Sequence, residues 1–118
     1  MLYKITNKTK NILISPKAKI ADDFFKRLIG LMFKKFMDKE EVLIFKHASS
    51  IHTCFMRFPI DIVFLNKEMR IIRICKAVKP WRAVFCPGSL FTLEFPSPAA
   101  CGKSLELGNI LELSPLLR

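Results

Sequence analysis

Extended apolar segments, closely paired cysteines and acidic side chains are all scarce in this sequence of 118 residues. No apolar run approaches the roughly 18 residues that a membrane-spanning helix needs, and residues 1–10 are too polar for a secretory signal. The four cysteines, Cys54, Cys75, Cys86 and Cys101, form no CxxC pair, so we expect reduced thiols rather than a disulfide framework. These absences predict a soluble, cytoplasmic protein with no transmembrane segment.

The charge balance favours anionic partners without naming one. Acidic residues number 10 against 20 Lys and Arg, which gives a formal net charge of +10. Hydrophobic residues make up 51% of the chain, enough to supply a core and to argue against disorder. Because the sequence shows no repeat, linker or low-complexity tract, we expect one domain over residues 1–118.

Runs of β-branched and aromatic residues dominate the chain and predict strands. We expect a first hairpin from residues 2–6 and 12–15, and further strands over 42–45, 51–65, 70–78, 90–95 and 110–113. Pro59 cannot donate to a strand ladder, so it marks an edge, a bulge or a break within 51–65.

Helical spacing of apolar residues is confined to one stretch. Phe24, Leu28 and Leu31 recur at i, i+4 and i+7, which predicts a helix over residues 24–33. A second short helix or turn is expected after residues 97–98, because Ser can cap a helix and Pro suits its first position. The predicted fold class is therefore α+β, mainly β: a small single-domain β-barrel or two-sheet sandwich with one covering α-helix and a short second helix or turn.

Asp61 is the least expected residue of its strand, because apolar neighbours surround it. A buried carboxylate needs hydrogen-bond donors or a cation, since an unpaired buried charge is costly. Arg27 and Arg57 are candidates for that cation, because a guanidinium can meet a carboxylate through two parallel hydrogen bonds. The pattern is compatible with a structural ion pair and with an anion-binding or catalytic role.

Metal and nucleophile signatures are weak. His52 and Cys54 lie two residues apart and share a strand face, and with His47 and Asp61 they would provide four zinc ligands. Their spacing matches no recognised ligand pattern, so we expect no metal and no cofactor. A His–Cys catalytic pair has equally little support, because no feature of the sequence indicates an activated thiol.

Several ordered motifs resemble domain-of-unknown-function family 192. They are residues 27–33, the strand 51–65 with its core 56–61, Leu93-Glu94 and residues 107–109, so that the match runs from about residue 17 to 113. The resemblance implies a compact, mainly β domain with a covering helix and no established activity. The chain departs from the family pattern at residues 97–98, where Ala-Gly is usual, and at Asn109, where Asp is usual.

The polar positions that match the family pattern are Arg27, His52, Arg57, Asp61 and Glu94. If their strand faces converge, these residues line one polar cleft within an apolar wall, as ligand pockets commonly do. We therefore expect a binding module for a small ligand or peptide, with no partner identified and no oligomeric state indicated.

Two alternatives remain open at the level of sequence. The net charge and 11 phenylalanines favour nucleic-acid binding through a basic surface. Asp61 and Glu94 as a carboxylate pair, with His52 as a base, would suit a small hydrolase-like enzyme of unknown substrate, although no nucleophile, metal or cofactor signature accompanies them.

Overall fold

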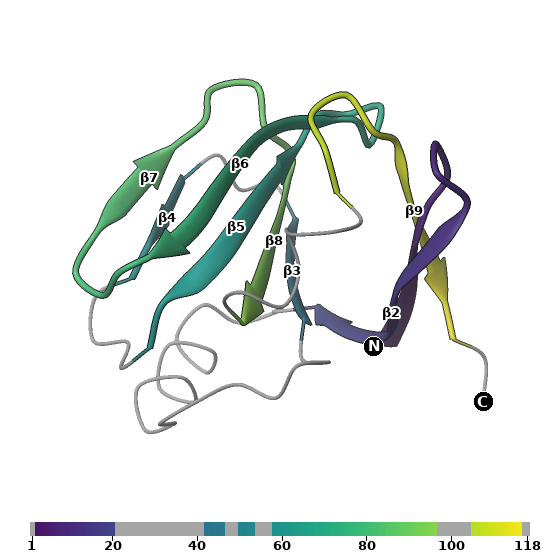
Figure 1. Cartoon of the computed structure of the whole chain (residues 1–118), viewed down its shortest axis with the longest axis horizontal. Coiled ribbons are helices and arrows are strands. Elements are labelled where there is room, and N and C mark those ends of the chain that lie inside the picture. Colours follow the sequence, from purple (N-terminus) through teal and green to yellow (C-terminus); the bar gives the residue numbers. More distant parts are fainter. Residues whose placement is uncertain (1, 21–41, 47–49, 54–57, 97–104, 117–118) are drawn as a thin grey trace.

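The computed structural model describes residues 2–20, 42–46, 50–53, 58–96 and 105–116, and all regular secondary structure in these ranges is β-strand (Figure 1). The nine strands are β1 (Leu2–Asn7), β2 (Ile12–Ile20), β3 (Val42–Lys46), β4 (Ser50–His52), β5 (Ile60–Leu65), β6 (Ile71–Val78), β7 (Ala83–Phe85), β8 (Phe91–Pro96) and β9 (Leu111–Pro115).

Seven of these strands form one mixed sheet in the order β6-β5-β8-β3-β2-β1-β9. Its neighbours are antiparallel except β2 and β3, which are parallel, with Ala18 opposite Val42. A parallel pair needs a long crossover connection, and residues 21–41, which connect these two strands, lie outside the described residues. The short strands β4 and β7 form a separate antiparallel pair.

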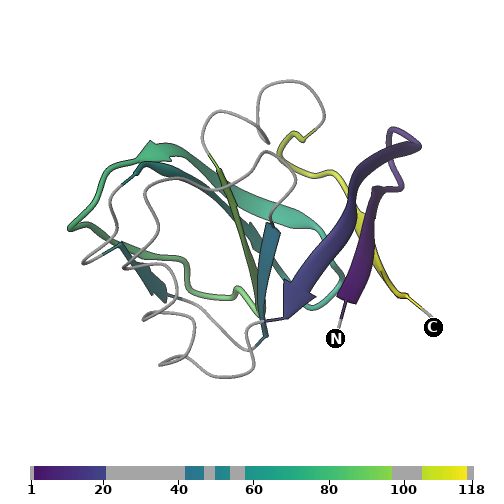
Figure 2. The same cartoon turned by 90° about the horizontal axis from the view of Figure 1, so that it is seen from below.

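The two edge strands of the large sheet, β6 and β9, meet at one end. Arg70 and Ile110 form an isolated β-bridge. The Ile71 amide donates to the Asn109 carbonyl at 2.8 Å, and the Leu111 amide donates to the Met69 carbonyl at 2.9 Å. The sheet is therefore curled into a half-barrel rather than flat (Figure 2).

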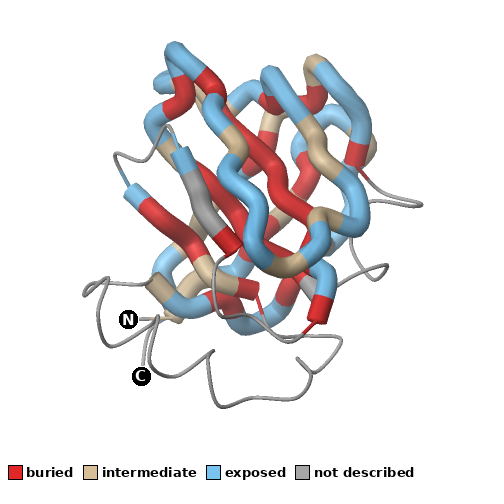
Figure 3. The backbone as a smooth tube through the Cα atoms, turned by 90° about the vertical axis from the view of Figure 1, so that its left-hand side faces the viewer, coloured by how far each residue is buried: buried red, intermediate tan, exposed pale blue. Residues whose placement is uncertain are grey.

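Two apolar clusters pack on opposite faces of this sheet. The concave cluster draws on all seven strands and includes Ile5, Ala18, Ile44, Val63, Leu65, Ile71, Leu93 and Leu111. The outer cluster lies over β3, β5 and β8, includes Phe45, Ile60, Ile62 and Phe64, and is packed by Val84 of β7. All six residues of β5 are buried, because both of its faces are covered (Figure 3).

The predicted α+β class is wrong. The described residues contain no helix, and their architecture is a curled half-barrel rather than a closed barrel or a two-sheet sandwich with a covering helix. The helix expected over 24–33 and the helix or turn expected after residues 97–98 both fall outside the described residues. No described segment is a helix that could cross a membrane.

Most of the strand predictions are confirmed. The first hairpin forms between β1 and β2, and the other expected strands correspond to β3, β6, β8 and β9, with a break in the stretch 51–65 that leaves Pro59 outside both β4 and β5. Strand β7 was not expected, because three residues carry too little periodic signal.

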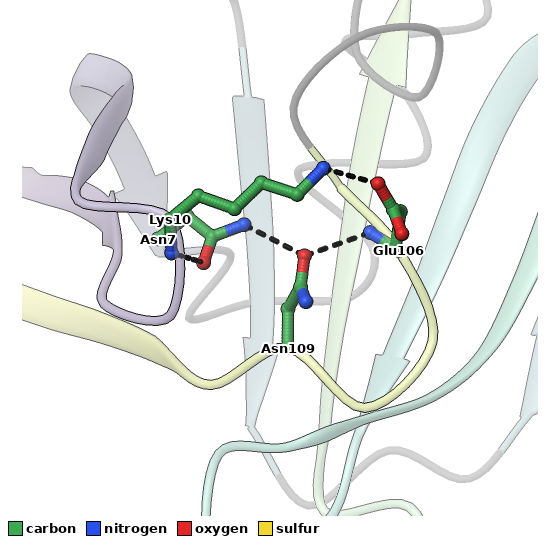
Figure 4. Close-up of polar contacts among 4 residues, drawn as sticks. All are labelled: Asn7, Lys10, Glu106 and Asn109. Atoms are coloured by element: carbon green, nitrogen blue, oxygen red, sulfur yellow. Dashed lines mark hydrogen bonds and ion pairs between the residues drawn. The ribbon is translucent and has the colours of Figure 1, made fainter.

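Asn109 joins the β1–β2 turn to the loop before β9 (Figure 4). Its Oδ1 accepts hydrogen bonds from the Asn7 side-chain amide at 2.9 Å and from the Glu106 backbone amide at 3.0 Å. The Lys10 ammonium forms an ion pair with the Glu106 carboxylate across the same gap, and this contact lowers the pKa of Glu106. The side-chain oxygen at position 109, which the usual Asp would also provide, is therefore one of the atoms that connect the two segments, together with the Lys8 amide, which donates to the Ile110 carbonyl at 2.8 Å.

We expect Asn109→Ala to lower the free energy of unfolding by about 1–3 kcal/mol, because it removes the acceptor of two hydrogen bonds. Asn109→Asp keeps an oxygen at this place and is expected to lose less than half as much. Urea denaturation followed by circular dichroism measures both. Equal losses in the two variants would show that the oxygen at position 109 is not what joins the segments.

Candidate functional site

Asp61 lies on β5 and is 2% exposed. Its Oδ1 accepts a hydrogen bond from the Ala77 backbone amide at 2.7 Å. The pairing of β5 with β6 shifts register between Ile60 and Ile62, and Ala77 has a left-handed backbone with φ of 50°. The carboxylate therefore holds a bulge in β6, which satisfies part of the hydrogen-bonding requirement of a buried Asp.

The predicted guanidinium partner of Asp61 stays a prediction. Arg27 and Arg57 both lie outside the described residues. What the structure adds is a hydrogen-bond donor from the backbone, which the sequence could not reveal because Ala77 reaches Asp61 only through the pairing of β5 with β6.

Glu94 lies on β8 and has no exposed surface. It stands opposite Leu43 on β3 and Ile62 on β5. Residues opposite each other in an antiparallel pair share a face, so Glu94 faces the outer cluster. Asp61 stands opposite Phe95, a member of the concave cluster. The register thus directs the two carboxylates to opposite faces of the sheet.

His52 ends β4, where it pairs with Ala83 of β7. The described residues contain no group of three His, Cys, Asp or Glu side chains suited to a metal ion, and His47 and Cys54 lie outside those residues. Of the five predicted site residues, Asp61 and Glu94 have described side chains, and the structure does not bring these two together across one face.

A different concave site was not found from the sequence. A hollow of about 470 Å³ opens on the concave face, between β1, β9 and the paired ends of β3 and β8, under the turn that joins β5 to β6. Its lining is Tyr3, Lys8, Lys46, Glu68, Met69, Phe91, Ile110, Leu111, Glu112 and Leu113. The hollow exists because β6 and β9 bridge at one end of the sheet without pairing along their described lengths.

Lys46 and Tyr3 lie close together on the lining of the hollow and combine a positive charge with an aromatic ring. The Lys46 ammonium lies 5.8 Å from the centroid of the Tyr3 ring, within the range of a cation–π contact. Lys8 and Glu112 form an ion pair at 3.5 Å on the same lining. The one available signal in the sequence is that Lys46 continues the inward alternation of Val42 and Ile44, which places a cation at the end of an apolar strand face.

Comparison with known proteins assigns the family. The family model DUF192, described as "Uncharacterized ACR", matches residues 4–113. The chain belongs to this family. The predicted resemblance is thereby confirmed.

Relatives of this DUF192 protein include two archaeal proteins named only as UPF0127 proteins. One, from Pyrococcus furiosus, is 34% identical over an alignment of 119 positions, which covers 94% of this chain and 98% of the relative. The other, from Pyrococcus horikoshii, is 38% identical over an alignment of 108 positions, which covers 86% of this chain and 90% of the relative.

The fold also matches a solved structure. A crystal structure of a protein of unknown function from Novosphingobium aromaticivorans superposes with a TM-score of 0.75 at 20% identity, over 95% of this chain and 84% of that one. This similarity shows that the two proteins share a fold.

The Cys86 thiol of this DUF192 protein does not suit nucleophilic chemistry. Cys86 is buried in the outer cluster. Burial raises the pKa of its thiol, the Arg73 charge opposes that rise, and Cys75 adds to it. A raised pKa keeps the sulfur protonated at neutral pH, whereas the thiolate is the attacking form.

We expect Asp61→Ala to lower the free energy of unfolding by about 1–3 kcal/mol, because the Ala77 amide loses its acceptor. Asp61→Asn, which keeps a side-chain oxygen, is expected to lose less than half of that amount in urea denaturation. If Asp61→Asn lost as much stability as Asp61→Ala, the negative charge of Asp61 would be what stabilises the fold, as the predicted ion pair with a guanidinium requires.

We expect Ala77→Gly to raise the free energy of unfolding by up to about 1 kcal/mol. An L-residue with a side chain pays to adopt a left-handed backbone, whereas glycine adopts it readily. The gain is reduced by the greater freedom of glycine in the unfolded chain. Lys76→Gly, one residue earlier in β6, is the matched control and should destabilise. A loss in Ala77→Gly would contradict strain at this bulge.

Proposed function

We propose that this DUF192 protein is a binding module for a small amphipathic ligand, and that the ligand binds in the concave hollow. The observation that supports this most directly is the hollow itself, because about 470 Å³ falls within the usual range of small-molecule sites. Such sites combine apolar walls with a few polar groups, and this lining has both.

The lining indicates the chemistry of the ligand. Tyr3, Phe91 and Leu113 offer apolar and aromatic surface on one side. Lys46 is exposed at the end of β3 and offers a positive charge beside the Tyr3 ring. A ligand with a flat or apolar body and one anionic group would use both features, as would a short peptide that ends in a carboxylate.

The geometry supports binding better than hydrolysis. A carboxylate pair that acts on one substrate must face that substrate from the same cavity. The register directs Asp61 and Glu94 to opposite faces of the sheet, and both are buried rather than lining the hollow. A ligand-binding or structural role for Arg27, His52, Arg57, Asp61 and Glu94 stays a prediction, in which Asp61 and Glu94 would act on opposite faces of the sheet.

We expect small anionic aromatic compounds, screened by ¹⁵N–¹H correlation NMR, to shift the backbone amides of Met69, Phe91 and Leu111. In Lys46→Ala the affinity of such a compound should fall about tenfold, the size of one charge-assisted hydrogen bond. Lys4→Ala removes the same charge from an exposed residue of β1 that does not line the hollow, and it should bind normally.

Two results would overturn this proposal. One is that Lys46→Ala and Lys4→Ala bind every hit as tightly as the parent chain. The other is that the shifted amides cluster around β4 and the start of β5, which would move the ligand site to the polar cluster predicted from the sequence.

A further inference from the structure

A separate surface, formed by β6, β7 and the loop between them, concentrates positive charge. A basic residue occurs at every third position from 70 to 82, and no acidic residue occurs between Glu68 and Glu94. All five of these basic residues are exposed: Arg70, Arg73, Lys76, Lys79 and Arg82. The nearest carboxylate along the pairing, that of Asp61, is buried and bound to the Ala77 amide. This surface therefore attracts anions.

Two exposed aromatic residues lie four positions apart on the same segment of the chain. Trp81 in the β6–β7 loop is 59% exposed, and Phe85 on β7 is 64% exposed. The Arg73 guanidinium donates to the Phe85 backbone carbonyl, so that one cation is tied to the strand that carries the second ring. Exposed aromatic side chains offer flat faces on which a partner can stack.

Thr53 holds the loop that carries Trp81. The buried Thr53 hydroxyl donates to the Lys79 carbonyl at 2.6 Å and accepts from the Arg82 amide at 2.8 Å. The Thr53 amide donates to the Arg82 carbonyl at 2.7 Å, and the Trp81 amide donates to the Thr53 carbonyl at 3.0 Å. Trp81 is thereby held with φ of 65°. A loop fixed in this way orders little further on binding, which lowers the entropic cost of docking.

We propose that this surface, made of Arg73, Lys79, Trp81, Arg82 and Phe85 and here called the basic-aromatic surface, binds single-stranded nucleic acid. Its backbone phosphates would lie against the cations while successive bases stack on the two rings. Strand β7, which carries Phe85, lies beside β4 at the left of Figure 1, whereas the residues that line the hollow belong to β1, β3, β8, β9 and the turns after β1, before β6 and before β9. The two sites share no residue.

The order of side chains favours a nucleic acid over a lipid surface or an acidic peptide. Along the chain, cation and ring alternate as Lys79, Trp81, Arg82 and Phe85. A single strand alternates phosphate and base in the same way. A membrane surface would favour rings grouped at one depth with cations around them, and the Asp and Glu side chains of an acidic peptide offer no ring for Trp81 and Phe85 to stack on, whereas every nucleotide of a single strand does.

Trp81 is the single tryptophan of the chain, so its fluorescence reports on this surface alone. We expect short oligothymidylate and oligouridylate to quench Trp81 emission, and added salt to reverse the quenching. In an anisotropy titration with labelled oligonucleotide, Trp81→Ala should weaken binding about 5- to 150-fold, the range for one stacked base. Trp81→Phe should recover most of the affinity.

The double variant Lys79→Ala with Arg82→Ala tests the phosphate contacts. It should flatten the slope of log affinity against log salt by about 1.4, since each neutralised phosphate of a single strand contributes about 0.7. Lys4→Ala with Lys19→Ala makes the same charge change on exposed residues of β1 and β2 and should leave the slope nearly unchanged. Thermal melts of all variants exclude unfolding as the cause of any loss.

Three results would overturn the proposal. If the two double variants flattened the salt slope equally, the binding would depend on the net charge of the protein and not on this surface. Quenching by polyglutamate as strong as by the oligonucleotides would assign the surface to acidic proteins. A shift of Trp81 emission with vesicles of phosphatidylcholine and phosphatidylglycerol, without oligonucleotide binding, would assign it to membranes.

Discussion

The meeting of β6 and β9 at one end of the sheet is the constraint on which the architecture depends. Backbone hydrogen bonds from Ile71 to Asn109 and from Leu111 to Met69 join the two edges of a seven-stranded sheet. Once those edges are joined, the sheet must curl, and the side chains on its concave face must pack against each other. The concave core and the hollow beside it follow from this closure. The Asn7–Asn109 hydrogen bond stabilises the loop that makes the junction.

The local parts of this fold could be predicted from the sequence, and the long-range parts could not. Alternation and β-branched runs located the first hairpin and most of the strands, because strand formation leaves a period of two in the sequence. The β2–β3 parallel pairing, the β6 bulge and the bridge between Arg70 and Ile110 leave no such trace, since each joins residues far apart in the chain. The α+β class rested on one apolar repeat, over residues 24–33, which lies outside the described residues, and the described residues contain strands and no helix.

The candidate site divides in the same way. Burial of Asp61 could be anticipated from its apolar neighbours, and the need for a donor followed from the cost of an isolated carboxylate. The donor, the Ala77 amide, could not be named, because it depends on a register shift. The assumption that Asp61 and Glu94 face the same space failed for a related reason. Which face each carboxylate takes is set by its own pairing, with Phe95 for Asp61 and with Ile62 for Glu94.

The topology determines where the net charge of +10 is concentrated on the folded chain. Both halves of the sequence carry an excess of basic residues, so the count alone does not locate a basic surface. In the folded chain β9 lies beside β1, so Glu112 and Glu106 from the C-terminal part pair with Lys8 and Lys10 from the N-terminal part. Two further acids, Asp61 and Glu94, are buried. The remaining acid of that half, Glu68, pairs with Lys67 in the turn between β5 and β6. No carboxylate is thus left on the segment from Arg73 to Phe85, which is a positive surface.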